Sequence, residues 1–297
     1  MTTIGESEMQ QSETNSAVLL IHCPDKRGIV ASVTAFVYEH HGNILYLDQH
    51  VDAEKHIFFM RIEWDRDGFT LTGDQITEEF HQSVGSKFGM RWQLYFSYQT
   101  PRMAIFVSRR SHCLYDILAR YEIGEWPVQI PVIISNHQDL RPVADRFGID
   151  YHHVPITRDN KSRQERKQLN LLKEYEIDVI VLARYMQILT KQFVDYYPEK
   201  IINIHHSFLP AFPGARPYHS AYERGVKVIG ATSHYVIPDL DAGPIIEQDV
   251  VHVSHTHTVG DLVRMGRDLE KVVLARAIRY HLQRKILVYD NRTVIFS

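Results

Sequence analysis

The stretch IDVIVL at residues 177–182 is aliphatic at five of its six positions and gives the clearest strand signal in the chain. Four further strand-like runs lie at residues 103–107, 128–135, 200–204 and 228–237. Helical patterns lie among them at residues 113–121, 140–147 and 162–175, and a long amphipathic helix follows at 260–281. Strands that alternate with helices predict a parallel sheet. We therefore expect a Rossmann-like α/β domain over residues 100–297, which ends in a hairpin at 286–296.

The first third of the chain has a different order of elements. Strand patterns occupy residues 17–22, 44–51, 56–64 and 90–98, and helical patterns occupy 29–41 and 74–87. The order βαββαβ folds as one antiparallel sheet with two helices on one face, as in ferredoxin-like α+β domains. We expect this smaller domain at residues 17–99. A disordered tail at residues 1–16, which lacks the features of a signal peptide, would precede it.

Composition excludes several classes of protein. The formal net charge is −3, without the basic excess that nucleic-acid binding needs. Cys23 and Cys113 are the only two cysteines, so neither a disulfide framework nor a cysteine-rich zinc site is indicated. No apolar run approaches the ~20 residues of a membrane span. We expect a cytoplasmic protein that binds neither nucleic acid nor a membrane.

Two polar segments follow predicted strands of the larger domain. NIHHSFLP at 203–210 places Asn203 and His205 on one side of a strand, at the carboxyl end where open parallel sheets bind ligands. PDLDAGP at 238–244 contains Asp241. Taken alone, the first segment reads as a structural strand end and the second as a plain hairpin connection. Together they predict an amide that donates to an oxyanion, a histidine that relays a proton, and a carboxylate that orients the histidine.

These segments, with HYV at 234–236 and DAGPII at 241–246, resemble the folate-dependent formyltransferase family over roughly residues 103–297. The resemblance implies that Asn203, His205 and Asp241 form a catalytic triad, that a folate is the substrate, and that no metal or other cofactor is needed. LARYMQIL at 182–189 resembles the pterin-binding segment of the family. The residues expected to line the pterin pocket are Met186, Gln187, Ile188, Leu189, Ile201, Val236 and Leu240.

The segment SRRSHCLYD at 108–116 separates the branches of this family. It has no glycine, whereas the branch that transfers formyl groups to a ribonucleotide has a glycine-rich phosphate loop there. Like YHHVPIT at 151–157, GARPY at 214–218 and VYDNR at 288–292, it resembles the deformylase branch. That implies hydrolysis of 10-formyltetrahydrofolate to formate and tetrahydrofolate, which would supply formate for purine synthesis. Transfer to an amine acceptor and a non-catalytic folate or amino-acid sensor stay open, as does anion binding by Arg109 and Arg110.

The turn DKRGIV at 25–30 makes the smaller domain similar to an ACT domain. Such domains pair across subunits and bind small amino acids near this turn. The resemblance implies a homo-oligomer, with glycine or methionine as a possible effector and Arg27 and Asn43 as candidate ligands. An oligomerisation module without any ligand is an equally open interpretation.

The chain has 18 histidines, which raises the question of a metal site. HH at 152–153 and HVSHTH at 252–257 lack supporting carboxylates or cysteines, so we predict no metal. His112, His219 and His234 match positions where the family has polar pocket residues. We expect these three side chains to support the catalytic residues from a second layer.

Overall fold

The structure is a computed structural model that describes residues 15–210 and 217–296. Residues 1–14 of the expected tail and residues 214–216 of the GARPY segment lie outside the described part. The chain divides into two compact units, the first ending at Gln99 and the second spanning Thr100–Ile295. Phe296 groups with the first unit, although the sequence assigns it to the second.

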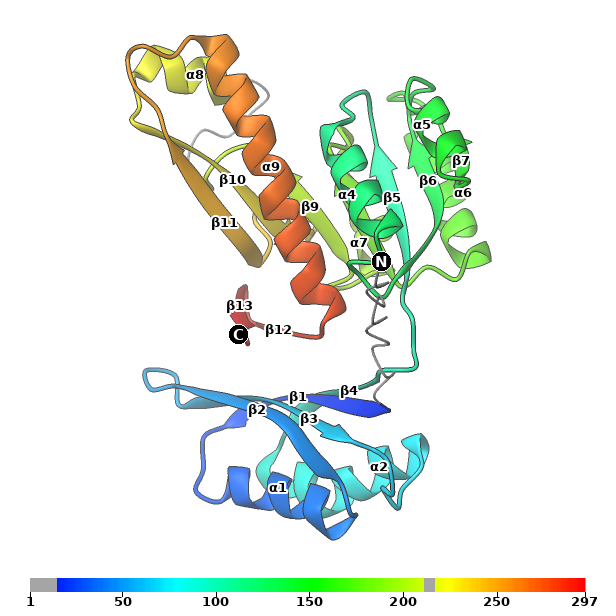
Figure 1. Ribbon diagram of the computed structural model, residues 1–297, viewed down its shortest axis with the longest axis vertical. Coiled ribbons are helices and arrows are strands. Elements are labelled where there is room, and N and C mark those ends of the chain that lie inside the picture. The colour runs from blue at the N-terminus through cyan, green and yellow to red at the C-terminus, as the bar shows by residue number, and fades with distance from the viewer. Residues whose placement is uncertain (1–14, 211–216, 297) are drawn as a thin grey trace, which may run out of the picture. The chain divides into compact units, whose positions relative to one another are not determined.

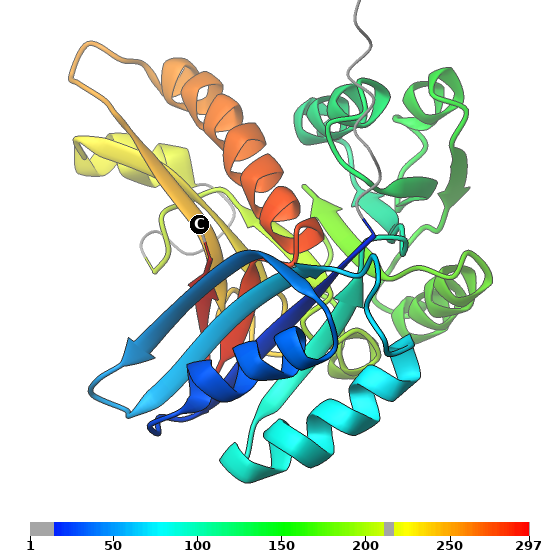
Figure 2. The ribbon, with the colours of Figure 1, turned by 60° about the horizontal axis from the view of Figure 1, so that its bottom comes forward.

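The first unit has the predicted βαββαβ order (Figures 1 and 2). Its four strands form one antiparallel sheet in the order β2-β3-β1-β4, and α1 and α2 lie on one face of it. The predicted apolar face of α1 is buried, which confirms the helical periodicity. The elements are β1 (Ser16–Pro24), α1 (Ile29–Glu39), β2 (Asn43–Asp52), β3 (Ile57–Asp65), α2 (Gly73–Phe80), η1 (His81–Gly85), α3 (Ser86–Phe88) and β4 (Arg91–Phe96).

The helix expected at 74–87 is one helical path in three pieces. A π-helical turn, η1, joins α2 to α3 and inserts an extra residue into the path. The buried side chains Phe80, Val84 and Phe88 are nevertheless spaced four apart, as in an uninterrupted helix. The sequence therefore predicts the helix but not the insertion within it.

The second unit contains a seven-stranded sheet in the order β11-β10-β9-β8-β5-β6-β7 (Figure 1). The strands from β9 to β7 are parallel, while β10 and β11 run antiparallel at one edge. The elements are β5 (Arg102–Val107), α4 (His112–Glu122), β6 (Gln129–Ser135), α5 (Arg141–Arg146), β7 (Asp150–His153), α6 (Lys161–Glu174), β8 (Val179–Ala183), α7 (Lys191–Asp195), β9 (Ile201–His205), α8 (Pro217–Arg224), β10 (Val228–Tyr235), β11 (Ile245–His252), α9 (Val259–Leu282), β12 (Ile286–Tyr289) and β13 (Arg292–Ile295).

The predicted α/β class is confirmed, and the differences concern short or polar elements. The sequence gives no sign of α7 or α8, and it misses the four-residue strand β7, two residues of which are histidines. Strand β11 is longer than the II at 245–246 suggested, because its later residues alternate buried and exposed only weakly. The hairpin of β12 and β13 is present as predicted, with its turn at Asp290-Asn291.

The central strand β8 is buried on both faces of the sheet. Val179, Val181 and Ala183 belong to the core beneath α4, α5 and α9. Ile180 and Leu182 belong to the core beneath α6 and α7 on the other face. Burial on both sides explains why this strand is continuously aliphatic rather than alternating. The two helical layers are visible on either side of the sheet in Figure 1.

Within the described residues, no helix combines the length and the apolar character that crossing a membrane requires. The longest one, α9, carries charged residues throughout its length.

Candidate active site

Asn203 and His205 lie at the carboxyl end of β9, beside the antiparallel strand β10. Antiparallel pairing sets His234 of β10 directly opposite Asn203. Directly paired side chains on one face of a sheet lie close enough to interact. Asn203 Nδ2 is 3.1 Å from His234 Nε2, and His234 Nδ1 is 2.9 Å from the carbonyl oxygen of Tyr235. That carbonyl can only accept, so the proton of His234 is on Nδ1 and its Nε2 accepts from the Asn203 amide.

Asp241 approaches these residues from the connection between β10 and β11. Its φ of 53° is left-handed, a conformation that Asp tolerates better than most residues. Asp241 Oδ2 lies 3.3 Å from His205 Nδ1, and Oδ1 lies 3.7 Å from His234 Nε2. The connection is tight at Gly243, where a Cβ would be 1.8 Å from the Tyr235 carbonyl oxygen. The fold thus brings Asn203, His205 and Asp241 together, with His234 beside them.

The charge of this group is concentrated on Asp241. The hydrogen bond with His205 is the main cause that holds the pKa of Asp241 well below its usual range, so the carboxylate is ionised at neutral pH. His205 Nδ1 is then the donor to that carboxylate. His205 Nε2 is buried and has no hydrogen-bond partner among the residues that the structure describes. Because this ring nitrogen has no partner among the described residues and its imidazole is paired with an anionic carboxylate, it can form a hydrogen bond with a polar group of a reacting substrate.

A cavity of about 310 Å³ opens beside the triad. Apolar side chains around it are unusually exposed: Met186 is 53% exposed, Ile188 57% and Leu240 63%. Exposed apolar groups that rim a cavity containing a few polar groups are typical of a ligand site. Its lining residues are Leu182, Arg184, Tyr185, Met186, Gln187, Ile188, Leu189, Asn203, Ile204, His205, His206, His234, Val236, Ile237, Pro238, Asp239, Leu240 and Asp241.

Six of the seven residues expected to line the pterin pocket border this cavity, and Ile201 does not. Ile201 has no exposed surface and belongs to the core cluster that includes Phe193 and Val194 of α7. It shares a strand face with Asn203 but lies two residues farther from the carboxyl end of β9. At that depth α7, which the sequence did not reveal, covers the sheet.

Hydrogen bonds from neighbouring elements fix the segment at 184–189. Met186 N donates to Ser108 Oγ at 2.9 Å, and Lys161 Nζ donates to the carbonyl of Ile188. Immediately after the segment, Thr190 N donates to Glu165 Oε1 at 3.0 Å, and the side chain of the same threonine caps the N-terminus of α7. Because both ends of the segment are fixed, its apolar side chains remain at the rim of the cavity.

The structure separates the three histidines that were expected in a supporting role. His234 contacts Asn203 and Asp241 directly. His112 lies in another cluster, with Nε2 2.8 Å from Glu270 Oε2. His219 is exposed on α8 and does not line the cavity.

Glu270, Arg184 and Tyr218 form a buried polar cluster with His112 that the sequence analysis missed. Glu270 is 1% exposed, and it lies on the same face of α9 as the buried Val273 and Leu274. A single carboxylate on the apolar face of an amphipathic helix is the signal that could have revealed it.

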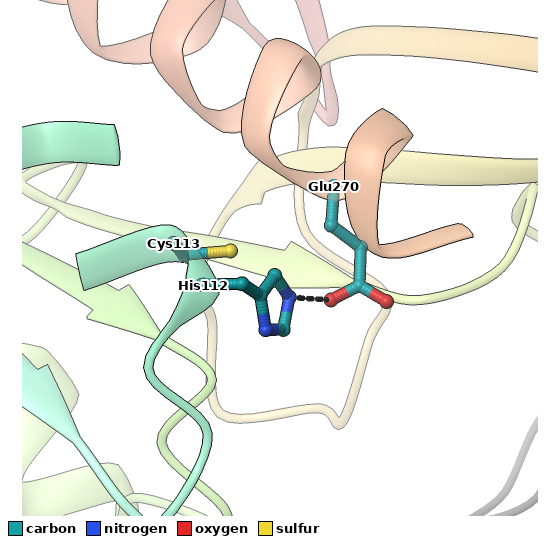
Figure 3. A group of neighbouring side chains, drawn as sticks. All are labelled: His112, Cys113 and Glu270. Carbon is teal, nitrogen blue, oxygen red and sulfur yellow. Dashed lines mark hydrogen bonds and ion pairs between the residues drawn. The ribbon is translucent and has the colours of Figure 1, made fainter. Parts of the chain in front are cut away.

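His112, Cys113 and Glu270 are the only group in the described residues that could offer three metal-ligating atoms, all within 4.8 Å of one another (Figure 3). Burial, together with the charge of Glu270, raises the pKa of Cys113 far above its usual range, so it remains a thiol. The Glu270 carboxylate already faces His112, Tyr218 and Arg184. These contacts complete its coordination by hydrogen bonds and an ion pair, which does not favour a metal site.

The two histidine-rich stretches considered for metal also have other partners. His152 Nε2 lies 3.0 Å from the Tyr175 hydroxyl, and His153 Nδ1 lies 3.1 Å from Gln138 Nε2. In the second stretch, His257 Nδ1 accepts from Ser254 N at 2.9 Å. These contacts give His152, His153 and His257 structural partners at a strand end and in a loop.

Acid should destabilise the second unit through His206. Burial, followed by the nearby charge of Arg184, lowers the pKa of His206 to about 4. In the unfolded chain this histidine takes up a proton near pH 6.5, so its contribution is present above that pH and is lost as the pH falls towards 4. We expect this group alone to lower the free energy of unfolding by about 2 kcal/mol between pH 7 and pH 5.

The variant His206→Phe tests this because it keeps a ring at the position but cannot titrate. Urea unfolding at pH 7 and pH 5 should show a smaller loss of stability in the variant than in the unchanged protein. The same loss in both proteins would contradict the assignment. His219→Phe, at an exposed histidine, serves as the matched control and should leave the pH dependence unchanged.

Comparisons with known proteins agree with this geometry. The formyl transferase family matches residues 101–278, and the ACT domain family matches residues 17–84. A formyltetrahydrofolate deformylase of Synechocystis is 57% identical over 95% of this chain and 99% of its own length. One from Bacillus subtilis is 47% identical over 98% and 97%. The crystal structure of a formyltetrahydrofolate deformylase from Pseudomonas syringae superposes with a TM-score of 0.93, at 46% identity over 97% of this chain and 96% of that one. With both domains matched in order and over nearly the full length, the chain belongs to the formyltetrahydrofolate deformylase family.

Proposed function

We propose that the triad hydrolyses 10-formyltetrahydrofolate to formate and tetrahydrofolate. The observation that carries the proposal is the ionised Asp241 held 3.3 Å from His205, at a cavity whose rim exposes apolar side chains. Relatives at 43% to 57% identity over nearly the whole chain are formyltetrahydrofolate deformylases. The pterin would lie against Met186, Gln187, Ile188, Leu189, Val236 and Leu240.

The reaction needs a nucleophile, a stabilised oxyanion and a proton for the leaving nitrogen. Water is activated by the Asp241 carboxylate, and its oxygen bonds to the formyl carbon. Asn203 donates a hydrogen bond to the oxygen that becomes negative, and His205, as an imidazolium whose Nδ1 donates to Asp241, donates a second one from Nε2. The bond from carbon to N10 then breaks, and the proton taken from water reaches N10 through Asp241. This sequence of steps uses only side chains and water, so the proposal includes no cofactor.

The test is a product assay with 10-formyltetrahydrofolate as the sole substrate. Formate and tetrahydrofolate should appear in equal amounts without any added acceptor. Turnover that starts only when an amine is supplied would identify a formyltransferase instead. Binding of the folate without turnover would point to a sensor.

The tight turn at Gly243 gives a second test of the mechanism. In Gly243→Ala, the added methyl group would overlap the Tyr235 carbonyl and push the Asp241 connection away. A displacement near 1 Å can cost about 10² in rate, so we expect kcat to fall by about 10 to 10². Gly260→Ala is the control, because its Cβ would have 3.5 Å to the nearest atom, Thr258 Oγ1. Equal kcat values in the two variants would contradict the proposed position of Asp241.

For the first unit, an ACT domain, we propose regulation by a small amino acid and assembly into a homo-oligomer. Arg27 and Asn43 are exposed, and Gly28, with a φ of 91°, forms the turn just before α1. A free amino acid such as glycine or methionine would bind near this turn. Calorimetric titration with each amino acid tests the proposed regulation, and the mass in solution by light scattering tests the proposed assembly.

Formate released by the second unit would supply purine synthesis.

A further inference from the structure

Arg184 occupies a backbone conformation that favours glycine. Its φ is 63°, immediately after β8 and before the segment that rims the cavity. A residue with a side chain in this region costs roughly 1–3 kcal/mol, whereas glycine adopts it freely. Because eight of the described non-glycine residues share this conformation, the backbone alone does not assign Arg184 a role, and its side-chain contacts must do so.

The Arg184 side chain is anchored by a buried carboxylate. Its Nε lies 3.4 Å from Glu270 Oε2, and the two side chains are 13% and 1% exposed. Glu270 Oε1 accepts from the Tyr218 hydroxyl at 2.7 Å, and Oε2 faces His112 (Figure 3). Gly266, one turn earlier on α9, makes room for this arrangement, because a Cβ there would be 2.2 Å from the Tyr218 hydroxyl. The guanidinium is therefore paired with a buried carboxylate that also contacts Tyr218 and His112.

Part of this cluster borders the cavity that the triad lines. Arg184 and His206 line the cavity, and Glu270 and Tyr218 behind them do not. The His206 ring stacks on His205 with 5.2 Å between centroids and lies 6.1 Å from the Tyr218 ring. Arg184 and His206 are thus the two lining residues that have this polar cluster behind them.

The segment that rims the cavity and the Glu270 side chain belong to opposite faces of the sheet. Tyr185 and Leu189 of the segment that rims the cavity pack in the core beneath α6 and α7. Glu270 lies on α9, which covers the other face. The triad lines the same cavity as both the apolar segment and Arg184, so a formyl carbon held at the triad would share this cavity with the guanidinium.

We propose that Arg184, positioned by Glu270, is a specificity-determining residue that closes the acceptor side of the cavity and leaves room for water alone. The inference rests on the proposed hydrolysis and deepens it. An amine acceptor would react by the same steps as water. Its nitrogen would bond to the formyl carbon, the bond from that carbon to N10 would break, and one proton of the amine would pass to N10. Its substituent, however, needs the space that Arg184 and His206 fill.

The test measures how the formyl group is partitioned between water and an added amine. The protein is incubated with 10-formyltetrahydrofolate and hydroxylamine or ethanolamine, and formate and the formylated amine are quantified against an enzyme-free blank. The unchanged protein should release formate with no enzymatic formylation of ethanolamine. Formylation of ethanolamine at a rate comparable to hydrolysis would overturn the proposal without recourse to any variant.

Arg184→Gly should raise the ratio of formylated amine to formate at least tenfold, while some hydrolysis remains. Glycine suits the left-handed backbone, but the substitution leaves Glu270 without its cation, so Arg184→Gly/Glu270→Gln is made in parallel. Arg284→Gly is the matched control: Arg284 has a φ of 54°, does not line the cavity, and should keep the unchanged ratio.

An unchanged partition ratio in both Arg184 variants overturns the proposal. So does loss of both hydrolysis and transfer in a folded variant, because a residue that only closes the cavity is not required for the chemistry. Absence of formate from the unchanged protein with folate alone would instead refute the proposed function, which keeps the two failures distinct.

Discussion

Asp241→Asn should lower kcat for formate release by a factor of about 10² to 10⁴, the usual contribution of a positioned acid–base group. The side chain keeps its shape, but an amide cannot take a proton from water or carry it to N10. The loss should be large because Asp241 is ionised next to His205 and no other carboxylate among the described residues contacts that imidazole. Binding of tetrahydrofolate should persist, because the apolar rim of the cavity is untouched.

The matched control is Asp116→Asn. Asp116 is an ion-paired carboxylate of nearly equal exposure, 24% against 23% for Asp241, but it pairs with Arg120 on α4 and does not line the cavity. Steady-state formate release and calorimetric binding of tetrahydrofolate, measured on both variants, separate chemistry from affinity. Turnover in Asp241→Asn equal to that of the control would refute the role assigned to Asp241.

The fold was predictable wherever one face or both faces of an element bury aliphatic side chains. β8 is aliphatic at each of its five positions because helices cover both sides of it, and α1 shows its buried face at helical spacing. α7 and β7 have only five and four residues, too few to display a period. Their positions depend on what the rest of the domain packs against them.

The site was predictable in part, because strand periodicity also fixes which side chains share a face. Strand alternation alone puts Asn203 and His205 on one side of β9, whereas the distance of Asp241 from them depends on the length and turn of the β10–β11 connection. Resemblance to a known family supplied that link. The pairing of His234 with Asn203 follows from strand register, which sequence periodicity does not determine. Arg184 was missed because nothing local marks a left-handed arginine.

Asn203→Ala should lower kcat by about 10² to 10³, equivalent to ~3–4 kcal/mol of transition-state stabilisation. The Asn203 amide has two N–H groups. One donates to His234 Nε2 at 3.1 Å, which fixes the orientation of the amide and leaves the other for the oxygen of the reacting formyl group. Because that oxygen becomes negative only as water adds, losing the donor should affect kcat more than KM.

Asn203→Asp separates the donor from the shape of the side chain. A carboxylate of the same size cannot donate and would repel the developing oxyanion, so its kcat should be at least as low as that of Asn203→Ala. Asn170→Ala, at an exposed position on α6, should retain full turnover. If Asn203→Asp kept most of the activity, donation from the Asn203 amide would not be required for the reaction. The role of oxyanion donor would then pass to His205, whose buried Nε2 has no partner among the described residues.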